Sequence, residues 1–152
     1  MGVPTLTTNG RVLHRAAAYD LLLKLLWFGR EHVFREKVLR LARLQAGESV
    51  LDVGCGTGTL AIAATKYVGP AGSVHGIDAS PEMLARGRKK SEKADAKVVF
   101  QNALAEALPF PDAQFDVVTT TVMLHHLPKK TRQACAALMP APPAGAVVKD
   151  VA

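Results

Sequence analysis

The sequence predicts an α/β fold in which a doubly wound, mostly parallel sheet of about five strands lies between two layers of helices. Short apolar segments alternate with amphipathic segments from about residue 46 onward, which is the order of a strand–helix repeat. Apolar runs such as Val117-Val118 and Val147-Val148 indicate strands that are covered on both faces, as in a parallel sheet. A glycine-rich turn also lies where the first strand meets a helix, and ligands bind at that place in such sheets.

Two helices are expected ahead of the sheet. Apolar residues recur at steps of three and four between Val12 and Leu26, which predicts an amphipathic helix that ends near Gly29. A second helix is expected at 31–44, before Ala46-Gly47-Glu48 breaks the helical pattern.

The rest of the chain is expected to alternate strands with helices. The expected strands are 49–53, 73–77, 97–101, 115–121 and 146–151. The expected helices between them are 57–68, 81–93 and 129–138. The helix at 81–93 has the clearest start, because Ser80 is a suitable N-cap and Pro81 fits the first helical position. Neither an internal repeat nor a linker is visible, so we expect one structural domain.

Composition and charge leave the nature of the partner open. The hydrophobic fraction of 49% and the charged fraction of 21% argue against wholesale disorder. The formal net charge of +6 permits an anionic partner, such as nucleic acid or a membrane surface. The basic residues gather only on the helix at 81–93, where a solvated helix face explains them. They are Arg86, Arg88, Lys89, Lys90 and Lys93.

Cysteine usage and hydropathy indicate the compartment. Cys55 and Cys135 are far apart and belong to no CxxC motif, which suits a reducing environment. The amino terminus lacks the apolar run of a secretory signal. The most apolar stretch, 16–28, contains Asp20 and Lys24 and is too short to span a bilayer. We therefore expect a soluble, cytoplasmic protein without a membrane span.

The segment LDVGCGTGTL, residues 51–60, is the most informative part of the sequence about ligand binding. Its glycines can take backbone angles that other residues avoid, and they let a ligand lie against the chain. A dinucleotide fingerprint, G-x-G-x-x-G, would need glycine at Thr59. Asp52, two residues before the first glycine, would repel a pyrophosphate but suits a cofactor with a cationic ammonium group and no phosphate. S-adenosylmethionine is such a cofactor.

A second acidic residue, Asp78, ends the second expected strand twenty positions after Gly58. A carboxylate at that place can accept hydrogen bonds from both hydroxyls of a ribose. The alternative is that Asp78 only caps the helix that begins near Ser80.

These residues resemble the class I S-adenosylmethionine-dependent methyltransferases. The resemblance covers residues 39–152 and is closest to the ubiquinone/menaquinone-biosynthesis-like (methyltransferase type 11) group of small-molecule methyltransferases. LDVGCGTG resembles the first motif of the family, and GIDASPEML its second-strand motif. LAEALPFPDAQFDVV resembles the segment along the adenine edge, and TTTVMLHHLP the loop that faces the methyl group.

The resemblance implies a Rossmann-like core at 46–152, a helical lid at 1–45, S-adenosylmethionine as the cofactor and methyl transfer to a small-molecule acceptor. Asp52 and the glycine turn would hold the methionine part, and Asp78 the ribose. Ala79 and Met83 would flank the adenine ring, and Thr121 would lie beside the sulfonium. The full set implied to contact the cofactor is Asp52, Gly54, Cys55, Gly56, Gly58, Asp78, Ala79, Met83, Leu104, Ala105 and Thr121.

The chain departs from the family in two places. Leu104 stands where many relatives have an aspartate that accepts the adenine amino group, so that hydrogen bond would be missing, while the main chain of Ala105 and apolar contacts would still hold the ring. Relatives read something like LKPGG before the fifth strand, whereas residues 138–145 are LMPAPPAG, and relatives continue into two further strands. We expect a C-terminally truncated or divergent form that lacks those strands. Its fifth strand would be an exposed edge through which a homo-oligomer could form.

No obligatory catalytic residue follows from methyl transfer, because the acceptor supplies the nucleophile. His125 is the one candidate for a general base or an acceptor contact. No metal site is expected, because His125 and His126 point in different directions and lack a third ligand at a suitable spacing. Tyr19 would either cover the cofactor or pack in the core.

Three other functions stay open at this point. A truncated chain could be a non-catalytic cofactor-binding or interaction module. A nicotinamide-dependent oxidoreductase is a second alternative, against which Thr59 and Asp52 count. Nucleic-acid binding has only the net charge in its favour. The methyl acceptor and its reacting atom are not defined by the sequence.

Overall fold

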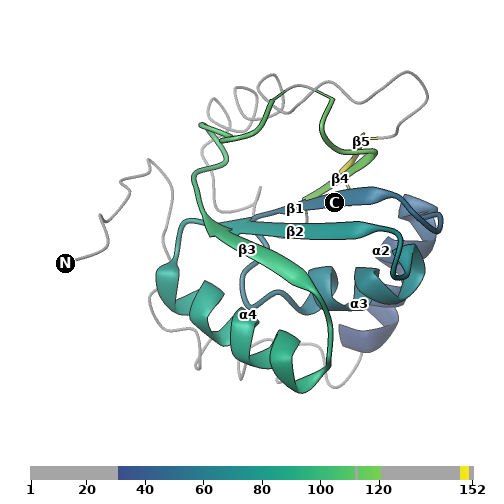
Figure 1. Ribbon diagram of the computed structural model, residues 1–152, viewed down its shortest axis with the longest axis horizontal. Coiled ribbons are helices and arrows are strands. Elements are labelled where there is room, and N and C mark those ends of the chain that lie inside the picture. The colour runs from purple at the N-terminus through teal and green to yellow at the C-terminus, as the bar shows by residue number, and fades with distance from the viewer. Residues whose placement is uncertain (1–30, 112, 121–147, 151–152) are drawn as a thin grey trace.

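The computed structural model describes residues 31–111, 113–120 and 148–150. Within them, five parallel strands form one sheet in the order β3-β2-β1-β4-β5 (Figure 1). The strands are β1 (Ser49–Val53), β2 (Ser73–Asp78), β3 (Val98–Asn102), β4 (Val117–Thr120) and β5 (Val148–Asp150). The helices are α2 (Glu31–Ala42), α3 (Thr59–Val68) and α4 (Pro81–Lys93). The predicted α/β fold with a parallel sheet of about five strands is confirmed.

The strand order reverses beside β1, which is the feature that positions a ligand site. From β1 the chain builds outward through β2 to β3, and it then returns to place β4 on the other side of β1. In doubly wound sheets, ligands bind at the carboxyl ends of the strands beside such a reversal.

The observed elements lie close to the predicted ones, with small corrections at their ends. The helix predicted from residue 57 begins at Thr59, because Gly58 takes a left-handed conformation with φ of 71° and serves as the N-cap. The predicted N-cap Ser80 is confirmed, since its Oγ accepts the Met83 N–H. The helices predicted at 12–29 and 129–138 lie outside the described residues. Of the helices that the structure describes, none combines the length and hydrophobicity needed to cross a membrane.

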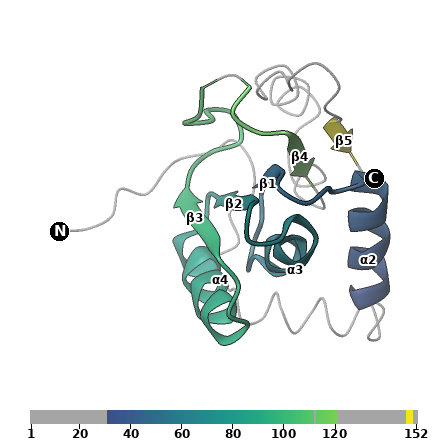
Figure 2. The ribbon, with the colours of Figure 1, turned by 45° about the vertical axis from the view of Figure 1, so that its right-hand side comes forward.

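One face of the sheet is covered by α2, α3 and α4, which lie side by side beneath it (Figures 1 and 2). Alternate strand residues point to this face, as the two-residue period of a strand requires. They form a core with the apolar sides of α2 and α3 that removes most of their surface from water. The buried members are Val38, Leu39, Ala42, Leu44, Val50, Leu60, Ala61, Ala64, Val68, Val74 and Val117.

The opposite face carries a second core, which holds the segment after β3 against the sheet. Leu108 and Phe110 pack against this core. Its buried members are Leu51, Val53, Ile77, Ala103, Phe115 and Val118. The His75 ring meets Phe110 and Phe115 edge to face, with centroids 6.0 and 5.2 Å apart. Burial lowers the pKa of His75, which favours its neutral ring in this apolar setting. The second helical layer predicted for this face stays a prediction, because 129–138 lies outside the described residues.

Candidate functional site

The glycine turn that follows β1 is built from three left-handed glycines. Gly54, Gly56 and Gly58 have φ values of 71°, 56° and 71°, a region in which a side chain is strained. The Cys55 N–H donates to the Ile77 carbonyl at 2.9 Å, which ties the turn to β2. The Gly58 N–H donates to the Cys55 carbonyl at 2.9 Å and closes the turn onto the start of α3. No side-chain hydrogen bond caps α3, so its first N–H groups have no side-chain acceptor at the cap.

Asp52 is a buried carboxylate at the carboxyl end of β1, with only 2% of its surface exposed. Its Oδ1 accepts a hydrogen bond from Thr119 Oγ1 on β4 at 3.1 Å. Its Oδ2 has no hydrogen-bond partner among the described residues. Burial raises the pKa of Asp52 to about 7, the Thr119 hydrogen bond opposes the rise and the negative charge of Asp78 adds to it. A buried acceptor without a donor is unfavourable, so this oxygen could accept a hydrogen bond from a ligand that brings a donor.

Asp78 ends β2 and joins the glycine turn to the start of α4. Its Oδ2 accepts the Gly56 N–H and its Oδ1 accepts the Ser80 N–H, each at 2.8 Å. Burial raises the pKa of Asp78, and these two backbone hydrogen bonds oppose the rise. Ser80 is the N-cap of α4, and Asp78 bonds the glycine turn as well as the Ser80 N–H, so Asp78 does more than cap the helix. Each carboxylate oxygen has a second lone pair that a ligand hydroxyl can use.

The predicted adenine contacts differ in how much surface they offer. Ala79, Leu104 and Ala105 are partly exposed next to the ends of β2 and β3. Leu104 pairs with Ala107 in an isolated antiparallel bridge, which makes a tight turn of this segment. Met83 is 2% exposed, so its side chain is packed inside the protein.

Asn102 holds the end of β3 beside the end of β2. Its Nδ2 donates to the Asp78 carbonyl at 2.9 Å, and the Ala103 N–H donates to the same oxygen at 3.2 Å. The structure thus brings together the turn at 54–58, Asp52, Asp78 and the segment that begins at Ala103. The implied contact Thr121, the catalytic candidate His125 and Tyr19 lie outside the described residues, and their roles stay predictions.

Sequence reasoning missed the partners that hold these residues. The sequence did not predict that Thr119 contacts Asp52, because the contact depends on the register of β4 against β1. The basic helix face was only partly a solvated face. Lys90 Nζ donates to Thr57 Oγ1 at 2.6 Å, and Arg88 Nη2 donates to the Phe100 carbonyl at 3.0 Å. A signal for Lys90 did exist, since it lies three positions after the buried Gly87 and so faces inward.

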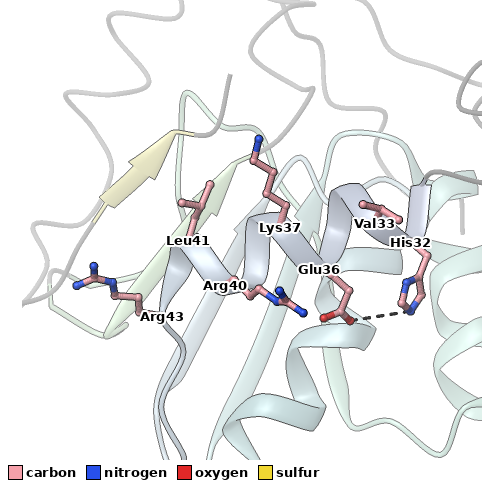
Figure 3. Close-up of a pocket in the computed structure, with 7 residues that line it drawn as sticks. All are labelled: His32, Val33, Glu36, Lys37, Arg40, Leu41 and Arg43. Carbon is pink, nitrogen blue, oxygen red and sulfur yellow. Dashed lines mark ion pairs between the residues drawn. The ribbon is translucent and has the colours of Figure 1, made fainter.

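A separate pocket lies along α2 and does not share these features (Figure 3). Its lining residues are His32, Val33, Glu36, Lys37, Arg40, Leu41 and Arg43. His32 Nε2 and Glu36 Oε1 are 4.0 Å apart along one side of the helix. The described lining comes from one helix and its end, ahead of β1, so polar groups from different elements do not converge there.

Comparisons with known proteins identify the family of the chain. Residues 50–140 match the family model described as a methyltransferase domain, which is more than half of the chain. Demethylmenaquinone methyltransferase from Thermus thermophilus is 44% identical over 68% of this chain and 47% of that protein. The enzyme of the same name from Geobacillus kaustophilus is 39% identical over 78% of this chain and 51% of that protein. The chain thus spans about half the length of these relatives.

A solved structure extends the likeness to the backbone. A SAM-dependent methyltransferase from Aquifex aeolicus superposes with a TM-score of 0.57 and 30% identity, over 64% of this chain and 53% of that chain. The chain therefore belongs to the class I S-adenosylmethionine-dependent methyltransferase family, in its menaquinone- and ubiquinone-like group.

Proposed function

We propose that this chain binds S-adenosylmethionine at the carboxyl ends of β1 and β2 and transfers its methyl group to a small-molecule acceptor. The observation that carries the proposal is the buried Oδ2 of Asp52, which lacks a hydrogen-bond donor among the described residues beside a left-handed glycine turn. The proposal concerns activity, which family membership alone does not establish, because the fold supports many reactions.

The charges at the site favour a cationic ligand without phosphate. An ammonium group would give Asp52 Oδ2 its missing donor and would compensate the charge of a buried carboxylate. A pyrophosphate would place negative charge beside Asp52 and Asp78, both of which burial already makes harder to ionise. The two carboxylates therefore fit S-adenosylmethionine better than a dinucleotide.

The remaining polar groups fit the other parts of the cofactor. The uncapped N–H groups at the start of α3 would hold a carboxylate, as helix amino ends do. Asp78 keeps acceptor capacity for ribose hydroxyls after it has bound Gly56 and Ser80. Ala79, Leu104 and Ala105 offer apolar surface to the adenine ring, with the Leu104 side chain unable to replace the aspartate of relatives.

The protein contributes alignment rather than acid–base chemistry at the described residues. The cofactor supplies a methyl group on a sulfonium, so the acceptor needs only a nucleophile in line with it. Asp52, Asp78 and the rigid turn hold the donor in one orientation, and the apolar segment packed by Phe110 and Phe115 keeps water from the adenine side. In this proposal, Thr121 lies beside the sulfonium and His125 accepts a proton or contacts the acceptor.

The finer parts of the proposal concern the acceptor and the surroundings. The relatives named above are demethylmenaquinone methyltransferases, so a demethylated quinol is the first acceptor to test. We place the lid at 1–45 and the core at 46–152, and we expect a soluble, cytoplasmic protein. A homo-oligomer through the β5 edge is part of the proposal, because β5 is an edge of the described sheet.

Calorimetry with S-adenosylmethionine and with its demethylated product tests the binding step. We expect a dissociation constant in the micromolar range, which corresponds to a binding free energy of about −8 kcal/mol. We expect no heat of binding with NAD. A folded protein that binds neither compound would reject the proposal. Binding without turnover on a panel of quinols and other small acceptors would reject methyl transfer and would favour a binding module.

A further inference from the structure

Lys90 reaches from α4 to the start of α3. Its Nζ lies 2.6 Å from Thr57 Oγ1 and 3.4 Å from Thr59 Oγ1. The two hydroxyl oxygens are 3.4 Å apart, and Thr57 is 4% exposed. Because the two threonines stand on either side of Gly58, the ammonium group holds both flanks of the residue that ends the glycine turn and caps α3.

Phe100 makes a second connection between the same two helices. A Cβ on Gly58 would lie 2.5 Å from its ring, and a Cβ on Gly87 would lie 3.0 Å from it. The ring from β3 therefore fills the space between the turn and α4, with glycine on both sides. Packing holds Gly58 in place, while Lys90 fixes the side chains next to it.

Lys90 lies in the last turn of α4, where a cation suits the dipole of that helix, but its ammonium group also lies at the start of α3. A cation beside the amino-terminal end of a helix opposes the helix dipole. The first turn of α3 carries no acidic side chain that would offset the charge. A neutral side chain would thus stabilise α3 at least as well, so the dipole of α3 does not account for the contact of Lys90 with Thr57 and Thr59.

We propose that Lys90 is a positioning residue for the cofactor turn at 54–58. Through Thr57 and Thr59 it holds the end of the turn and the first N–H groups of α3 in the arrangement that receives the cofactor. A turn that is ordered before binding loses less conformational freedom when the ligand arrives, so the affinity is higher. The inference rests on the proposed function, since it names a residue that supports the same site.

The role of Lys90 predicts a change in affinity and not in chemistry. Replacing Lys90 by methionine keeps the length and helix propensity of the side chain but removes the ammonium group. We expect the variant Lys90→Met to bind S-adenosylmethionine about tenfold more weakly, the size of one lost charge-assisted hydrogen bond. In turnover, KM for the cofactor should rise by about the same factor while kcat stays unchanged.

The matched control is Lys89→Met, which removes the same charge from the exposed neighbouring position. Thr57→Val removes the hydroxyl partner, and Thr57→Ser restores it. If Lys90 acts through Thr57, the double variant Lys90→Met/Thr57→Val should bind about as well as Thr57→Val alone. Additive losses, wild-type affinity in Lys90→Met, or an equal loss in Lys89→Met would overturn the inference.

A measurement without cofactor separates this inference from the proposed function. Hydrogen exchange of the backbone N–H groups at 54–60 should be faster in Lys90→Met than in Lys89→Met, because the turn is less ordered. Equal exchange would overturn the role of Lys90 even if the wild type binds the cofactor. Should the methionine variant fail to fold, Lys90→Gln, which keeps a neutral donor, should still bind the cofactor more weakly and exchange faster at 54–60 than Lys89→Met, and no loss in either measurement would contradict the role.

Discussion

The carboxyl ends of β1 and β2 carry one acidic residue each, and the two residues are held in different ways. Asp78 accepts two backbone N–H groups, one from the glycine turn and one from the start of α4. Asp52 accepts one hydroxyl from β4, and its other oxygen has no partner among the described residues. Asp78 thus already contributes to the fold before a ligand binds, whereas Asp52 is left incomplete until one does. The difference separates a residue that builds the site from a residue that, in the proposed function, binds the ligand.

Removing Asp78 should have the largest effect on stability, and that effect should appear in the protein without ligand. The variant Asp78→Ala leaves the N–H groups of Gly56 and Ser80 without their acceptor, so the free energy of unfolding should fall by about 3 kcal/mol. Urea denaturation without ligand measures the change. Glu92→Ala, on the exposed part of α4, is the control and should change stability little. If Asp78→Ala loses no more stability than the control, Asp78 does not support the fold more than Asp52 does.

Neutralising Asp52 should instead reduce affinity while sparing stability. The variant Asp52→Asn keeps an acceptor for Thr119 but loses the charge that faces the ligand. We expect the affinity for S-adenosylmethionine to fall about a hundredfold, or about 3 kcal/mol. The free energy of unfolding at pH 8 should stay the same or rise, because a buried charge has been removed. Calorimetry and denaturation of the same sample decide the matter, and a stability loss like that of Asp78→Ala would contradict the comparison.

The pH dependence of binding should report Asp52. Its pKa of about 7 means that the ligand-free carboxyl is protonated below that pH and must ionise to pair with an ammonium group. Affinity should therefore rise about tenfold per unit up to pH 7 and level off above it. The contribution of Asp52 to stability should have the opposite sign: it is greatest below about pH 4 and is lost as the pH rises through 7. Titration at several pH values checks this, and Asp52→Asn should show a flat profile.

The smallest expected effect concerns the hydrogen bond that keeps Asp52 ionisable. Thr119→Val removes the donor to Oδ1 and keeps the shape of the side chain. We expect a stability change of about 1 kcal/mol and an upward shift of the pH midpoint of binding, since the hydrogen bond lowers the pKa of Asp52. The same midpoint in the variant and the wild type would mean that Thr119 does not control ionisation. Thr120→Val, at the neighbouring buried position, is the control.

Much of the fold was predictable because its signals are local. The strand at Ser49–Val53 and the helix at Pro81–Lys93 have the predicted bounds, since apolar runs, an N-cap serine and a proline each act on neighbouring residues. The three glycines with positive φ could also be read from their spacing. The start of α3 was misplaced by two residues, because a left-handed Gly58 can both end a turn and cap a helix.

The amino-acid sequence was sufficient to predict the kind of fold, the place of the candidate site and the two acidic residues in it, because these depend on patterns within short segments. Only the tertiary structure decided that Thr119 meets Asp52, that Asp78 links the turn to α4 and that Lys90 turns inward to Thr57. Each of these contacts joins elements far apart in the chain. Strand register and helix orientation come from the packing of the whole core, so no local pattern specifies them.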